Sequence, residues 1–299
     1  GQSLGRQLWV FAGGWSTAAA AAVAKRPAGF EVLDGLSTLL DRSLIRVDQR
    51  GPTSRYALLE TSREYALDAL AERGELAATR RRHAAHFLRL AEEGADGMTT
   101  PAQTAWRRRL ELEHPNLRAA ADTLTQSGDI ALLLRLTHAL SFSWFTNTHG
   151  AEGLQHHRHV LAHETGQIVS RARALVDAGM LAYSAGAYTD AIQWFEEALP
   201  ILQDHHETET LAVAWLLRGT VAEHLGDACE LAGAVHEVDG ELGQAGVWPA
   251  RFHHRLAGES AFHSPAYGDK TAALATLAGL GGAWVDAWKA SEDGFPCAT

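Results

Sequence analysis

ARALVDAGMLAYSAGAYTDAIQWFEEAL, residues 172–199, is the stretch of sequence that indicates the fold of this chain. Small residues recur within it at Ala178, Gly179, Ala182, Ala191 and Ala198. Large apolar residues recur at Leu175, Tyr188, Phe195 and Leu199. Small side chains let two antiparallel helices approach closely, and large ones fill the space between them. Because Gly186 separates two halves of helical length and glycine favours a chain reversal, the stretch predicts a helix–turn–helix unit.

This unit resembles a tetratricopeptide (TPR) repeat, a helix–turn–helix element of about 34 residues. One such unit cannot bury its apolar face alone, so neighbouring units are expected. Downstream, Gly219 and Gly226 repeat the spacing of Gly179 and Gly186, with both pairs offset by 40 residues. We therefore predict a second, degenerate unit after the first.

A third unit is predicted upstream. Gly150 lies 36 residues before Gly186, between two helical runs over 130–145 and 152–163. The array of repeats would then span 129–243, and the first helix of each pair would line a groove for a protein or peptide partner. The residues predicted to line this groove are Arg173, Asp177, Met180, Tyr183, Leu216, Thr220 and Glu223.

Residues 1–75 predict a winged-helix-like domain. The apolar spacing indicates helices over 4–12, 16–24 and 30–41, strands over 43–47 and 55–59, and a longer helix over 60–73. Ser16 or Thr17 is a suitable N-cap for the second helix. On the third helix, the residues predicted to be buried are Val32, Leu33, Leu36, Leu39 and Leu40. The predicted fold is therefore mostly α, with a winged-helix-like domain followed by a TPR-type α-solenoid.

The amino-acid sequences of several segments show, in addition, a resemblance to a protein family. These segments are LWVFAGGWS (8–16), LLDRSLIRVD (39–48), RYALLETSREYALDALAERGE (55–75), RRRHAAHFLRLAEE (80–93) and WRRRLELEHPNLRAAADTL (106–124). Together they resemble the region that follows the ATPase module in bacterial STAND-type regulators, which include LuxR-type and AfsR-like transcriptional regulators. The resemblance implies a regulatory and protein-interaction segment, with a helical linker over 76–128. It also implies an ATPase module N-terminal of Gly1, against which the winged-helix domain would pack.

The sequence predicts no catalytic activity within this chain and no cofactor or metal. A phosphate-cradling G-x-x-x-x-G-K-[ST] loop is missing. In related STAND proteins a Met-His-Asp motif touches bound ADP, but the matching positions here are Leu58, Leu59 and Glu60, and leucine cannot hydrogen-bond a phosphate. The many histidines, such as His83 and His157, complete no zinc-ligand pattern and are interpreted as surface residues of helices.

The charge pattern disfavours direct DNA binding. The net charge is −10, and residues 121–299 carry most of the acidic excess. The helix over 30–42 occupies the position of a recognition helix, but its outward residues are Glu31, Asp34, Ser37, Thr38, Asp41 and Arg42. Three acids and one base suit a phosphate-rich groove poorly. The basic triplets 80–82 and 107–109 are interpreted as a solvated helix face paired with nearby acids.

The remaining features concern the compartment and the C-terminal segment. Cys229 and Cys297 match no disulfide or metal spacing, which indicates a reducing, cytoplasmic environment. No stretch is long and apolar enough to span a bilayer, so no membrane association is expected. Residues 244–299 carry no repeat register and are predicted to be irregular. Two alternatives remain open, a free-standing TPR adaptor and a winged-helix DNA-binding protein that binds duplexes through residues 1–75.

Overall fold

The structure is a computed structural model, and it describes residues 2–24, 32–48, 54–58, 63–98, 100–163 and 168–225. Most of these residues are helical and the one sheet among them is small, so the predicted mostly α, solenoid-like fold is confirmed. Two compact units divide the chain. The first holds Gly1–Gly94 and Arg108–Leu136, and the second holds Ala95–Arg107 and the chain from Thr137 onward.

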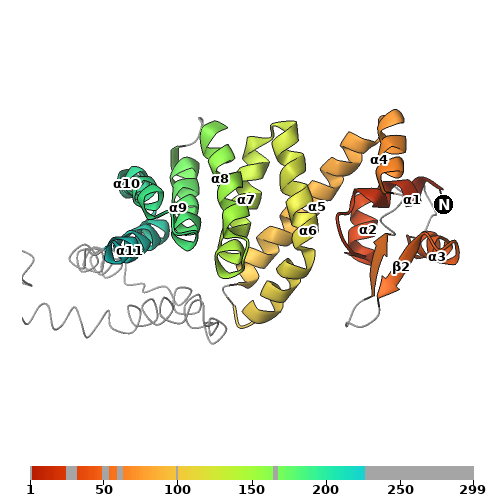
Figure 1. The fold of residues 1–299 in the computed structure, drawn as a ribbon, viewed down its shortest axis with the longest axis horizontal. Helices are drawn as coiled ribbons and strands as arrows, with labels where there is room; N and C mark the ends of the chain where they lie inside the picture. The colour runs from red at the N-terminus through yellow and green to blue at the C-terminus, as the bar shows by residue number, and fades with distance from the viewer. Residues whose placement is uncertain are drawn as a thin grey trace, which may run out of the picture. The chain divides into compact units, whose positions relative to one another are not determined.

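Apart from the strand β1 (Trp15–Ser16), the secondary-structure elements follow the order expected from the sequence (Figure 1). The N-terminal elements, which we call the helix–hairpin module, are α1 (Gln2–Gln7), the 3-10 helix η1 (Leu8–Val10), β1 (Trp15–Ser16), α2 (Thr17–Val23), α3 (Val32–Asp41), β2 (Ile45–Asp48), β3 (Arg55–Leu58) and α4 (Arg63–Glu72). The longer helices that follow are α5 (Leu76–Gly97), α6 (Gln103–Ser127), α7 (Ile130–Thr146), α8 (Gly150–His163), α9 (Ile168–Ser184), α10 (Tyr188–Asp204) and α11 (Thr208–His224).

The helix–hairpin module closes around a small antiparallel sheet of order β1-β3-β2. The strands β2 and β3 form the predicted hairpin, whereas β1 was not predicted and pairs Trp15 with Tyr56 of β3. Ser16 is the N-cap of α2, because its hydroxyl accepts the Ala19 backbone N–H at 3.2 Å. Trp15 is fully buried and stacks on Phe11, with 5.2 Å between ring centroids. The module therefore has an aromatic core to which the short strand β1 contributes Trp15.

Helix α3 differs from its prediction on one face. Leu36 and Leu39 are buried as expected, but Leu33 is 57% exposed and Leu40 is half-buried. The buried stripe follows the i, i+4, i+7 spacing from Val32, which turns toward α1 and β2, and Leu33 lies about 100° away from it. The predicted burial of Leu33 is therefore wrong.

Helices α5 and α6 form an antiparallel hairpin. The parts of these helices up to Gly94 and from Arg108 onward belong to the first unit. A Cβ built on Gly94 of α5 would lie 2.8 Å from the Leu110 side chain of α6, so the glycine permits close packing. Further along the hairpin, His83 Nε2 lies 3.4 Å from Asn116 Oδ1. The segment 76–128, predicted as a helical linker, holds α5 and α6, and most of it packs in the same compact unit as the helix–hairpin module.

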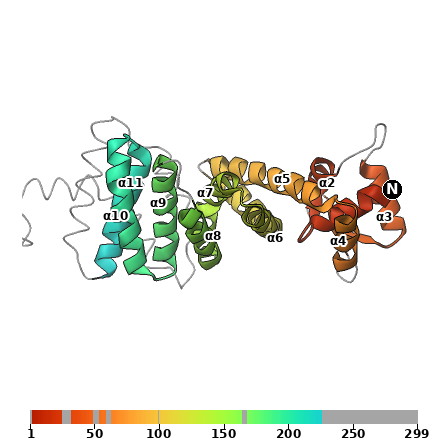
Figure 2. The same cartoon turned by 90° about the horizontal axis from the view of Figure 1, so that it is seen from above.

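The second unit contains what we call the helical array, residues 137–225. Helix α9 packs against α8, α10 and α11, and α10 packs against α11 (Figure 2). The two helices predicted on either side of Gly150 are present as α7 and α8, with α8 beginning at Gly150 itself. Gly186 has a φ of +76°, the left-handed conformation that glycine adopts freely at a reversal.

Several predictions concern residues beyond those described. They include Gly226, the second helix of the degenerate downstream unit, the segment 244–299, Cys229 and Cys297. Among the described helices, none combines the length and the apolar character needed to cross a membrane.

Candidate functional site

The seven residues predicted to line a partner groove lie on α9 and α11. Two of them keep accessible surface, because Arg173 is exposed and Met180 is half-buried. Four are buried, namely Asp177, Tyr183, Leu216 and Thr220. The side chain of Glu223 lies outside the described residues. Since α9 and α11 both pack against neighbouring helices, the four buried side chains are parts of the helix packing.

Two polar residues of the predicted groove set, Asp177 and Arg173, make contacts with other side chains of the helical array. Asp177 Oδ2 lies 2.7 Å from His138 Nδ1 of α7, and this contact joins α9 to α7. Arg173 Nη2 lies 2.5 Å from Glu207 Oε2, at the start of α11. These residues therefore connect neighbouring helices of the array.

All four arginines of the helical array are paired with carboxylates of neighbouring helices. The pairs are Arg158 with Asp190 (2.7 Å), Arg171 with Glu197 (2.9 Å), Arg173 with Glu207 (2.5 Å) and Arg218 with Glu196 (3.5 Å). Each exposed pair contributes little to stability. Their combined effect is to neutralise the cations, so the array offers no arginine free of a carboxylate to a nucleic acid phosphate.

A strip of aromatic rings crosses the array. Ring centroids lie 6.5 Å apart for Phe142 and Phe145, 6.4 Å for Phe145 and Tyr183, 6.0 Å for Tyr183 and Tyr188, and 5.5 Å for Tyr188 and His224. Tyr183 is buried, the two phenylalanines and Tyr188 are half-buried, and His224 is exposed. We call these five residues the aromatic strip, and it presents accessible ring surface from α7, α10 and α11.

The sequence contains a signal for this strip that the repeat analysis did not use. Phe142, Tyr183 and His224 follow one another at intervals of 41 residues. Successive first helices of a repeat array place equivalent positions side by side, so an aromatic ring at a fixed interval predicts a row of rings.

A buried histidine lies between α7 and α8. His157 is fully buried, and its Nε2 lies 2.8 Å from Ser141 Oγ. Because the Ser141 hydroxyl donates to the Thr137 carbonyl at 2.7 Å, its oxygen accepts the proton of His157 Nε2. Burial lowers the pKa of His157 to about 4, against the opposing effect of the Asp177 carboxylate. The prediction that the histidines face the surface is therefore wrong for His157, and also for the buried His83.

Acidification should destabilise the second unit through His157. Between pH 6.5 and pH 4 the unfolded chain binds a proton on this histidine and the folded chain does not, so stability falls as the pH drops. The loss between pH 7 and pH 5 should be about 2 kcal/mol. Urea unfolding of the wild type and of His157→Gln at both values measures it. Glutamine retains an N–H for Ser141 but does not titrate, so an equal pH dependence in both proteins would contradict this assignment.

In the first unit a polar network joins the helix–hairpin module to α6. Asn116 is fully buried, donates to the Gly14 carbonyl at 2.9 Å and to Glu113 Oε2 at 2.9 Å, and accepts the Ala12 N–H at 3.0 Å. Arg55 of β3 donates to Glu113 and, at 2.8 Å, to the Gly14 carbonyl. We call these residues the Asn116 network. The segment EHPN (113–116) was quoted above only for its resemblance to a family. The network shows that Glu113 and Asn116 of this segment hold α6 to the helix–hairpin module.

A second contact of this kind corrects the interpretation of the arginine triplet 80–82. Arg82 is half-buried, and its guanidinium donates to the Val23 carbonyl at 2.6 Å and to Gln7 Oε1 at 3.1 Å. It therefore caps the C-terminal end of α2 and is not part of a solvated face.

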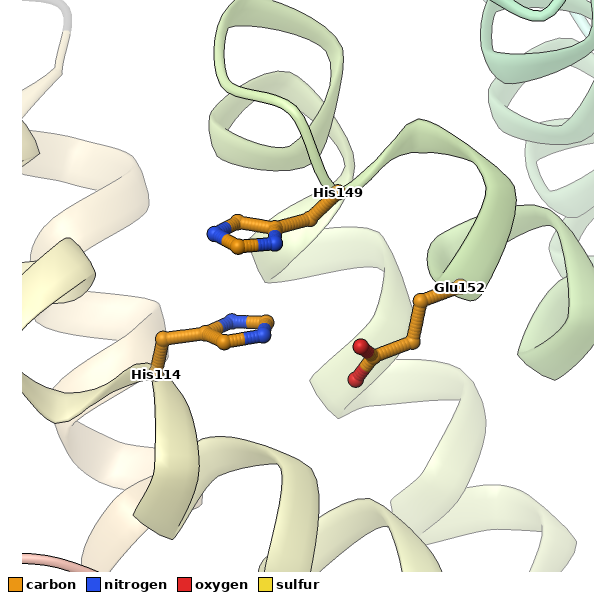
Figure 3. A group of neighbouring side chains, drawn as sticks. All are labelled: His114, His149 and Glu152. Carbon is orange, nitrogen blue, oxygen red and sulfur yellow. The ribbon is translucent and has the colours of Figure 1, made fainter.

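Figure 3 draws His114, His149 and Glu152, which are the residue types that bind metals. His149 and Glu152 lie at the start of α8 in the second unit, whereas His114 lies on α6 in the first. The three side chains belong to different compact units, so they do not make up a metal site of either one.

Comparisons with known proteins give a partial match. No family model matches the chain. The chain is 34% identical over 261 residues to provisionally named HTH-type transcriptional regulators of Mycobacterium bovis and of two strains of Mycobacterium tuberculosis. The match covers 79% of this chain and 29% of each relative. The chain therefore spans less than a third of the length of these relatives.

Proposed function

We propose that this chain is a regulatory, non-enzymatic segment of a larger transcriptional regulator. Its similarity to much longer proteins with that provisional name supports the regulatory role. Its helix pairs, with Gly179 and Gly186 at the close approach and the reversal, support the interpretation of the array as TPR repeats. In this proposal the array binds a protein or peptide partner, and an ATPase module of the STAND type precedes the chain.

The observation that carries the proposal is the aromatic strip. Half-buried rings offer apolar surface to a partner with little loss of side-chain freedom, because their positions are already fixed by stacking. Met180, the half-buried member of the predicted groove set, adds an adaptable apolar side chain on α9. A partner segment with apolar or aromatic side chains would suit this surface.

The helix–hairpin module is proposed to act as a winged-helix-like packing domain in the whole protein, and direct DNA binding is not favoured. Helix α3 exposes Asp34, Ser37 and Asp41, and Arg42 follows its last residue. Two exposed carboxylates would repel phosphates at the position where a recognition helix meets a groove. Partner binding on the array would bias how this module packs on the ATPase, which is a coupling between two sites.

Site-specific photocrosslinking in the full-length regulator tests the partner-binding role. A benzoylphenylalanine in place of Tyr188 or His224 should crosslink to the same polypeptide in the bacterium that encodes it. The control position is Gln193, which is exposed on α10 and is not part of the aromatic strip. Crosslinks of equal yield at all three positions, or none at Tyr188 and His224, would contradict the proposal.

A further inference from the structure

The helix–hairpin module has a notch with apolar walls. The notch has a volume of about 190 Å³ and lies between α1, the C-terminal end of α3, and the two strands of the hairpin. Trp9, Leu39, Ile45 and Leu58 contribute its apolar surface. An apolar cavity of about 150 Å³ can hold a benzene molecule. The notch therefore has room for one branched or aromatic side chain.

The backbone at the end of α3 places an exposed leucine at the edge of the notch. Ser43 has a φ of +53°, in the left-handed region, and the Leu44 N–H then bonds the Leu39 carbonyl at 3.0 Å. Leu44 lines the notch and is 40% exposed. A side chain seated in the notch would cover this apolar surface, which gives binding a hydrophobic contribution.

Two arginines give the notch a positive charge. Arg6 and Arg42 both line it, and no carboxylate among the described residues pairs with either. Arg6 Nε is buried, and it has no hydrogen-bond acceptor within the described part of the chain. Buried donors in folded proteins are normally satisfied by a protein group or by ordered water, and a ligand oxygen seated in the notch would also satisfy this N–H. A guanidinium recognises a carboxylate through short, charge-assisted hydrogen bonds.

We propose that the notch binds a segment of a partner protein in which a carboxylate side chain stands next to a branched or aromatic apolar one. The apolar side chain fills the pocket between Trp9 and Leu39, and the carboxylate reaches Arg6 and Arg42 at its rim. A nucleic acid fits poorly, because its phosphates bring no apolar side chain to fill the pocket between Trp9 and Leu39. The site lies wholly in the first unit, and none of its lining residues belongs to the helical array.

Methyl NMR of the 299-residue chain tests the site with a matched pair of probes. The probes are the blocked dipeptides Ac-Leu-Glu-NH₂ and Ac-Leu-Gln-NH₂, which differ only in charge. The glutamate peptide should produce saturable shifts at Leu39, Leu44, Ile45 and Leu58 in the millimolar range. The glutamine peptide should bind at least fivefold more weakly.

Substitutions separate recognition from general charge effects. Arg6→Gln and Arg42→Gln should each reduce the preference for the glutamate peptide to less than twofold. Arg46→Gln, an exposed arginine of β2 outside the notch, should leave that preference unchanged. Unchanged methyl spectra in the absence of peptide verify that each variant is folded.

Three results would overturn the proposal. They are the absence of saturable shifts with the glutamate peptide, equal affinity for the two peptides, and binding of inorganic phosphate as tight as that of the glutamate peptide. The last result would identify a simple anion site that does not recognise the apolar side chain.

Discussion

Replacing Arg55 by methionine should lower the free energy of unfolding of the first unit by about 3–5 kcal/mol. The substitution leaves the Glu113 carboxylate buried beside Asn116 without its cation. The two side chains are only 19% and 8% exposed, so water can replace little of the lost interaction. Removing one partner of a buried ion pair is more destabilising than the net contribution of the pair, because the remaining charge stays desolvated.

Hydrogen exchange in the intact chain measures this effect unit by unit. Amides of α5 in the first unit should lose protection in Arg55→Met, while amides of α10 in the second unit provide an internal reference. The double variant Arg55→Met with Glu113→Gln should recover at least half of the loss, because glutamine is neutral and its oxygen can still accept from Asn116. A loss below 1 kcal/mol in the single variant, or no recovery in the double one, would rule out this account of the network.

Phe195→Ala should destabilise the helical array by about 3–5 kcal/mol, the usual effect of removing a large aromatic side chain from a core. Phe195 is fully buried on α10. Its ring packs against Gly179 of α9, where a built Cβ would lie 2.6 Å from Phe195 Cε1. The glycine and the ring are thus complementary, and the loss of the ring leaves a cavity at the contact between two helices.

Because Gly179 and Phe195 fit closely together, we also expect their substitutions to have coupled effects on stability. Gly179→Ala should itself destabilise the array by about 1–3 kcal/mol, because the buried ring has to move. The same change should have a smaller effect in a Phe195→Leu background, where the ring is absent. Urea unfolding of the four proteins of this double-mutant cycle gives the coupling, and Gln193→Ala on the exposed face of α10 is the control. Additive effects in the cycle would contradict direct packing between the two positions.

These two predictions concern contacts of different origin. The Phe195 and Gly179 pair was accessible from the sequence, because both positions belong to the repeat pattern of one helix–turn–helix unit. The Asn116 network was not, because Asn116 and Gly14 are 102 residues apart and nothing in the local pattern of either segment indicates the other. From the sequence alone, the segment EHPN (113–116) only resembled a family motif, and its hydrogen bonds became visible in the fold.

The same difference explains which parts of the candidate site were predicted. The helices of the array were predicted because apolar periodicity is a property of neighbouring residues, and α7 and α8 end within two residues of the expected bounds. The groove set stays a prediction, and the structure adds that two of its polar members, Asp177 and Thr220, are buried. Which face of a helix is covered depends on the number of neighbours it has, and α9 has three.

By itself, the sequence determined the mostly helical fold, the helix pairs around Gly186, an N-cap at Ser16 or Thr17 and the hairpin of β2 and β3. Each of these follows from interactions between residues close in the chain, such as a capping hydrogen bond or a turn. Only the tertiary structure decided the rest, including the strand β1, the burial of His157, the Asn116 network and the notch beside Arg6. Each of these depends on which distant segments come into contact, and it is this contact that sets the desolvation of a side chain and its hydrogen-bond partners.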